Sequence, residues 1–141
     1  MPEGATIVWY GPQVKATVRK VELRRVDMAA RFLRDYIKVK LGRSQPTENR
    51  VSKKGNRYKK GLAPSAKGEY PKKLYGNLRK NIQMALDPAT LSARVGTNVE
   101  YGKWLELGTS RMQKRPWLSR GLSEAAPQLR AILKGSVISA Q

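Results

Sequence analysis

The chain has 141 residues, 40% of them hydrophobic, which suits one folded domain and excludes a wholly disordered protein. It contains no cysteine and no histidine, which excludes disulfides, thiolate metal sites and the commonest general base near neutral pH. Lysine and arginine number 29 against 10 acidic residues, and the net charge of +19 favours nucleic acid or an acidic protein as partner.

The N-terminal part of the chain predicts a short strand followed by a long helix. Residues 6–10, TIVWY, are β-branched and aromatic, which is typical of a strand. Residues 13–41 lack Gly and Pro, and their apolar residues recur three or four apart, which indicates a helix with Pro12 in its first turn and Gly42 at its end. Such a helix extends roughly 45 Å, so one end should pack on something outside its own domain.

Residues 43–73 have no apolar periodicity and carry ten basic residues against two acidic ones. Such a composition buries too little apolar surface to offset its ordering entropy. We therefore expect a long basic loop that is flexible by itself and is held in place by a neighbouring subunit.

The following segment predicts a helix and then a strand. The helix should begin with Asn77 as a cap, place Leu78, Ile82 and Ala85 or Leu86 on one face, and end at Asp87-Pro88. Residues 89–97 alternate apolar and polar side chains, which predicts a half-buried strand.

Two more helices are expected at the C-terminal end. Residues 99–107 should form a short helix that turns Tyr101, Trp104 and Leu105 toward the core and ends at Gly108. The last helix should begin at Pro116, with a stripe of Leu118, Leu122, Ala125, Leu129 and Leu133 that Pro127 kinks or splits.

Together these elements predict one α+β domain over residues 1–141. A small antiparallel sheet of at least two or three strands should pack against the long N-terminal helix and the C-terminal helix, with the long basic loop as an insertion.

The most informative stretch is residues 101–118, YGKWLELGTSRMQKRPWL. Gly108 permits a turn with positive φ, and Thr109 or Ser110 can brace it. The carboxylate of Glu106 can accept hydrogen bonds from turn N–H groups or meet Arg115 as the chain folds back. The residues therefore indicate a corner that stabilises the fold, with an intersubunit edge as the alternative.

The same stretch resembles the C-terminal signature of a family of small tail-component proteins from long-tailed bacteriophages. The matching residues are Tyr101, Glu106, Gly108, Thr109, Met112, Arg115, Pro116, Trp117 and Leu118. Upstream, the run GNLRKNI at residues 76–82 resembles that family's Gly-x-Leu-Arg helix start. The resemblance spans roughly residues 14–134, and its last third is the specific part.

That resemblance implies a structural subunit of a neck, tail-completion or tail-terminator ring at the head–tail junction. The expected partners are further copies of the chain, other connector and tail-tube proteins and, without sequence preference, the packaged DNA. We expect a location in the virion after assembly in the host cytoplasm. We expect no enzymatic activity, cofactor or membrane contact, because the carboxylates lack catalytic or metal-loop spacing and no apolar run approaches the roughly 20 residues of a membrane helix.

Exposed cations are the candidates for a contact surface or a DNA channel, with a solvated face as the plain alternative. They are Arg24, Arg25, Arg31, Lys53, Lys54, Lys59, Lys60 and Arg111. The rival function is a basic nucleic-acid-binding module of ribosomal or nucleoid type. Against it, Tyr58 and Tyr70 are the only aromatic residues in 43–73, and we expect Trp104 and Trp117 in the core rather than stacked on bases.

Overall fold

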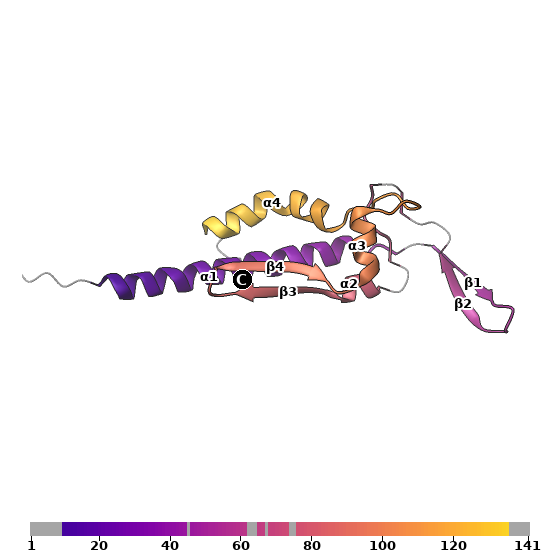
Figure 1. Ribbon diagram of the computed structural model, residues 1–141, viewed down its shortest axis with the longest axis horizontal. Helices are drawn as coiled ribbons and strands as arrows, with labels where there is room; N and C mark the ends of the chain where they lie inside the picture. The colour runs from indigo at the N-terminus through magenta and orange to yellow at the C-terminus, as the bar shows by residue number, and fades with distance from the viewer. Residues whose placement is uncertain (1–9, 45, 62–64, 67, 74–75, 136–141) are drawn as a thin grey trace, which may run out of the picture.

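The structure, a computed structural model, describes residues 10–44, 46–61, 65–66, 68–73 and 76–135 and has an α+β arrangement (Figure 1). In chain order the elements are α1 (Gly11–Lys40), β1 (Thr47–Val51), β2 (Arg57–Gly61), α2 (Asn77–Lys80), β3 (Ile82–Asp87), β4 (Ser92–Thr97), α3 (Glu100–Leu107) and α4 (Leu118–Lys134). The long helix and the short helix α3 lie where the sequence predicts them, and the half-buried strand predicted over residues 89–97 is confirmed for residues 92–97, because residues 88–91 form the turn between β3 and β4. No helix in the described part of the chain is long and apolar enough to span a membrane.

Helix α1 is the axis of the molecule (Figure 1). Helix α4 and the β3–β4 hairpin both pack along its second half, while α2 and α3 lie at its C-terminal end. Two segments project from this body in opposite directions, namely the first half of α1 at one end and the β1–β2 hairpin at the other. The molecule is therefore elongated around a small core.

The predicted helix over residues 77–87 is wrong beyond its first turn. Helix α2 ends at Lys80, and β3 pairs antiparallel with β4, with Ile82 opposite Thr97. Along β3 the exposure alternates, so that Ile82, Met84 and Leu86 face inward. Those residues also fit a period of two, and pairing with β4 supplies the backbone hydrogen bonds that select the strand. The predicted cap is also wrong, because Gly76, at φ 80°, is the capping residue instead of Asn77.

The expectation of a structureless loop over residues 43–73 is wrong for its middle part. Strands β1 and β2 form an antiparallel hairpin, with Thr47 opposite Gly61, closed by a turn at Ser52. In that turn the Ser52 amide donates to the Asn56 carbonyl (2.8 Å), and the Gly55 amide donates to the Ser52 carbonyl (2.9 Å). The two strands pair with each other without an apolar face, and their outer edges are open to solvent, which is why no hydrophobic pattern marks the hairpin.

The core consists of two clusters on the second half of α1. The first joins Ile37 and Leu41 to Leu78, Ile82 and Trp117, and the second joins Ala29 to three α4 residues, Ala125, Leu129 and Ile132. The two helices approach closely at Gly121, where a Cβ would lie 2.7 Å from the side chain of Ile37. The absence of a side chain there lets α4 pack directly on α1.

Three smaller expectations need correction. Leu105 packs against the core, but Tyr101 and Trp104 are exposed, because Gly102 is the α3 residue that faces inward. Helix α4 begins at Leu118 rather than Pro116 and runs unbroken through Pro127. Its inward face is Gly121, Ala125, Leu129 and Ile132, and Leu122 and Leu133 are about half exposed. Residues 6–9 of the expected first strand lie outside the described residues, and Tyr10 directly precedes α1.

Candidate functional site

The carboxylate of Glu106, at the end of α3, caps the first turn of α4. Its Oε2 accepts hydrogen bonds from the amides of Trp117 (2.8 Å) and Leu118 (2.9 Å), and its Oε1 accepts one from the amide of Ser119 (3.0 Å). These amides are among the donors that a helix start leaves without intrahelical partners. The negative charge also meets the positive end of the α4 dipole. The prediction that Glu106 accepts backbone N–H groups is confirmed, but the donors belong to the start of α4 and not to the adjacent turn, and Arg115 donates to Ser65 instead of pairing with Glu106.

The electrostatics of Glu106 follow from this arrangement. Burial raises the pKa of the carboxyl, but hydrogen bonds from the Ser119 side chain and from the amides of Leu118, Trp117 and Ser119 outweigh it, so the net pKa is lowered. Glu106 is therefore held as an anion that binds backbone donors. Such a group stabilises a corner and is not available as a proton donor near neutral pH.

The turn after α3 depends on Gly108 and Thr109. Gly108 has φ 76° and ψ 173°, a region that is essentially restricted to glycine. The hydroxyl of Thr109 accepts hydrogen bonds from the amides of Arg111 (3.3 Å) and Met112 (3.1 Å). Both predictions for this turn, positive φ and a bracing Thr109, are confirmed.

Most of the remaining residues of the motif complete the same corner, whereas Tyr101 is exposed on α3 and takes no part in it. The indole Nε1 of Trp117, which is 2% exposed, donates to the Gly102 carbonyl (2.9 Å). The guanidinium Nε of Arg115 donates to the carbonyl of buried Ser65 (3.0 Å), and the Arg115 amide donates to the Leu105 carbonyl (2.7 Å). Pro116 and Leu118 are partly buried beside them. We call residues 105–119 the α3–α4 corner.

Sequence reasoning missed a second polar cluster, around Glu124 on α4. Its carboxylate accepts hydrogen bonds from the hydroxyls of Tyr36 (3.0 Å) and Tyr70 (2.9 Å) and from Nε of Arg120 (2.8 Å). Arg120 also lies over the Tyr70 ring, 4.8 Å from its centroid. The cluster fastens the segment before α2 to α1 and α4. The Arg120–Glu124 spacing of four residues on one helix was the signal available in the sequence.

Pairing to Arg120 is the largest cause that lowers the pKa of Glu124, ahead of the two tyrosine hydroxyls. Desolvation and the hydrogen bond to Glu124 raise the pKa of Tyr70. These shifts favour an ionised Glu124 carboxylate and a protonated Tyr70 phenol.

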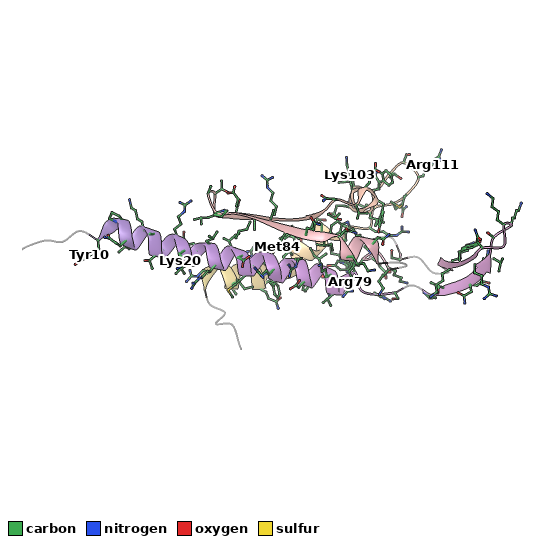
Figure 2. All side chains as sticks on the ribbon, turned by 90° about the horizontal axis from the view of Figure 1, so that it is seen from below. Tyr10, Lys20, Arg79, Met84, Lys103 and Arg111 are labelled. Atoms are coloured by element: carbon green, nitrogen blue, oxygen red, sulfur yellow. The ribbon has the colours of Figure 1, made fainter. Side chains whose placement is uncertain are left out.

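The predicted cationic residues do not form one surface. Arg24, Arg25 and Arg31 lie along α1, where Arg31 pairs with Asp27 (2.9 Å). Figure 2 places Arg111 at the opposite end of the molecule from Lys20, beside α3. The four lysines lie on the β1–β2 hairpin, two in its turn, Lys53 and Lys54, and two on β2, Lys59 and Lys60.

That hairpin, residues 46–61, which we call the basic hairpin, carries six basic residues and one acidic residue. The acidic residue, Glu48, pairs with Arg50 (3.0 Å). By strand alternation Arg57 and Lys59 share one face and Arg50 and Lys60 the other, so both faces are cationic. Apart from Gly61, every strand residue is exposed. The hairpin thus presents charge in two directions and contributes little to the core.

At the other end, residues 12–22 of α1 are all exposed, and we call them the helical arm. At a rise of 1.5 Å per residue the arm extends roughly 16 Å. Val14, Val18 and Val21 follow one face of it and are 57%, 48% and 40% exposed. Tyr10 stands at its free end (Figure 2). An apolar stripe on a projecting helix is typical of a contact surface.

An apolar groove of about 470 Å³ runs between α4 and β4, with α1 as its floor. The lining residues are Val26, Ala29, Ala30, Leu33, Leu91, Ser92, Ala93, Val95, Leu118, Leu122, Leu129 and Leu133. Ser92 is the one residue of that lining with a polar side chain. The groove has no chemistry for a reaction, but it fits another apolar element.

Comparisons with protein-family models, with curated proteins and with solved structures returned no match for this chain. Among the residues that the structure describes, no three His, Cys, Asp or Glu side chains gather closely enough to hold a metal ion. The described surface thus offers a stabilised corner, two projecting arms and an apolar groove.

Proposed function

We propose that this protein is an architectural subunit of the head–tail connector of a long-tailed bacteriophage, and that it works in a homo-oligomeric neck, tail-completion or tail-terminator ring. The observation that carries the proposal is the α3–α4 corner. There the residues that resemble the phage tail-component signature, Glu106, Gly108, Thr109 and Trp117 above all, lie in one hydrogen-bonded unit. In this chain the residues of the signature build one structural unit, and this supports reading them as a motif rather than as scattered coincidences.

The distribution of surface supports the architectural role. The helical arm and the basic hairpin project from opposite ends of a small core (Figure 1). The exposed surface of two projecting arms can be buried only against neighbouring molecules, as happens between the subunits of a ring. The Glu106 carboxylate is occupied by three backbone donors, so the motif's acid serves the fold instead of a reaction.

Imaging of purified virions tests this function directly. The protein's density, or a tag on it, should lie in the neck between capsid and tail tube. Particles that lack the protein should fill with DNA and remain tailless. Normal tails on particles without the protein, or a location away from the neck, would reject the proposal.

The basic hairpin favours a second candidate, a nucleic-acid-binding module. A two-stranded β-ribbon fits the DNA major groove, and cations on both faces can reach phosphates on both sides of it. Binding of this kind weakens steeply as salt rises. Sub-micromolar duplex affinity at physiological salt, without self-association or a place in the virion, would favour this candidate over the ring subunit.

A further inference from the structure

The helical arm carries its apolar residues on the same face of α1 that α4 covers further along. Val14, Val18 and Val21 lie at positions i, i+4 and i+7, and continuing this spacing reaches Ala29 and Phe32, which pack against α4. Helix α4 ends at Lys134, and the Gly135 that follows lies beside Arg25, so no helix among the described residues covers the three valines that precede Arg25. The α1–α4 interface thus continues as an uncovered apolar stripe.

The apolar groove is the complementary surface. It is walled by α4 and β4, and both elements pack on α1 and leave its floor open between them. Leu122 and Leu133 on the α4 wall are 49% and 46% exposed. A groove of this kind is suited to an amphipathic helix that inserts anchors spaced i, i+4 and i+7.

The stripe cannot enter the groove of its own chain. Val26, Ala29, Ala30 and Leu33 form the groove floor, and they belong to the same continuous helix as the valines. A helix cannot lie in a groove of which it is the floor. Any valine stripe in the groove must therefore come from another molecule.

We infer that the helical arm of one copy docks through Val14, Val18 and Val21 into the α4–β4 groove of the next copy. The two contact surfaces differ, so the interface is heterologous, and repeating it builds a closed ring or an open filament. The inference deepens the proposed ring function by naming its intersubunit contact. A second copy is the occupant because this chain itself supplies the matching stripe, in continuity with an interface it already uses.

Because both copies are positively charged, their self-association should depend on the salt concentration. Each copy carries +19, so salt should strengthen the contact by screening repulsion while leaving apolar burial in place. Binding of the chain to nucleic acid has the opposite dependence. Self-association that weakens as salt rises would contradict docking through the valine stripe.

The absence of cysteine allows a direct cross-linking test. Val18→Cys and Leu122→Cys are made in separate proteins, and a short thiol cross-linker is added at high protein concentration. We expect a covalent dimer when the two variants are mixed and monomer when either is treated alone. The double variant should give a ladder of oligomers, and a mixture of Lys53→Cys with Leu122→Cys should stay monomeric.

Three results would overturn the inference. Cross-linked dimers of Val18→Cys alone would show symmetric pairing of arms, cross-links from Lys53→Cys would show non-specific collision, and monomer throughout would show that the copies do not dock. Val18→Asp should abolish self-association without lowering the melting temperature, because Val18 is exposed. Ala16→Asp, an equal charge change on the opposite side of the arm, should keep self-association.

The test separates this interface from the proposed function. Virion rings whose subunits show no link between residues 18 and 122 would reject the interface and keep the connector function. Specific cross-linking by a protein that is absent from the virion neck would keep the interface and reject the connector function.

Discussion

At the α3–α4 corner, polar groups meet in a partly buried unit, whereas nearly all residues of the two arms are exposed. On the helical arm, Arg19 reaches another part of the chain, since its guanidinium donates to the carbonyls of Pro88 (3.1 Å) and Ala89 (2.6 Å). Glu106 has three backbone donors, and Trp117 is 2% exposed with its indole N–H bonded to Gly102. Residues 12–22 and the strands of the basic hairpin contribute almost nothing to the core. Substitutions at the corner should therefore change folding, and substitutions at the arms should change assembly.

The largest effect should come from Trp117→Ala. Removing a buried indole leaves a cavity and removes the hydrogen bond to the Gly102 carbonyl, which should lower the free energy of unfolding by about 3–5 kcal/mol. Chemical denaturation measures the loss. Trp104→Ala is the matched control, because Trp104 is 45% exposed and its removal should be nearly neutral. If both variants lost the same free energy of unfolding, the claim that the corner stabilises the fold and the exposed surface does not would be contradicted.

Gly108→Val should have the second-largest effect on the free energy of unfolding. Its φ of 76° and ψ of 173° strain any side chain by about 1–3 kcal/mol. A Cβ there would also lie 3.0 Å from the Lys114 amide nitrogen and 3.1 Å from the Met112 carbonyl oxygen. Thermal melting should show a clear decrease, with loss of ring assembly. Gly96→Val has open space around its Cβ and no positive φ, so a comparable decrease there would contradict the explanation.

Glu106→Gln should lower the free energy of unfolding at neutral pH by about 1–2 kcal/mol, because a neutral amide is a weaker cap for α4. The folded-state pKa of Glu106 is lowered, so its stabilisation is fully present above the unfolded pKa and is lost as pH falls through the folded pKa. The difference in unfolding free energy between the wild type and Glu106→Gln should therefore narrow below about pH 4.5. Denaturant unfolding curves of both proteins, recorded across this pH range, measure the difference.

The control for that experiment is Glu22→Gln on the helical arm, which should leave the unfolding free energy unchanged at every pH. A Glu106→Gln protein with full stability and normal rings, but tailless particles, would move Glu106 from the corner to a contact with the next layer of the neck.

The smallest effect on stability should come from replacing Lys53, Lys54, Lys59 and Lys60 with Ser. Exposed substitutions of this kind typically change stability by less than about 0.5 kcal/mol each. Tail attachment should nevertheless fail, because the charge of the basic hairpin is directed outward. Melting curves and counts of tailed particles measure the two effects. Serine at four exposed cations elsewhere (Lys80, Lys103, Arg130 and Lys134) removes equal charge and should leave attachment intact.

Local patterns in the sequence determined much of this fold. The spacing of apolar residues between Gly and Pro predicted α1, alternation predicted β4, and the backbone freedom of glycine placed the end of α3 at Gly108. These features depend on neighbours within a few residues, which the sequence displays directly.

The tertiary structure decided what depends on distant partners. Ile82 fits a helical stripe with Leu78 as well as it fits a strand, and only pairing with β4 selects the strand. The donors to Glu106 lie 11 to 13 residues away, and Trp117 is buried while Trp104 is exposed because Gly102 is the residue of α3 that faces the core. Whether a side chain is buried depends on how the elements pack, so two tryptophans in one short stretch of sequence can be buried and exposed, respectively.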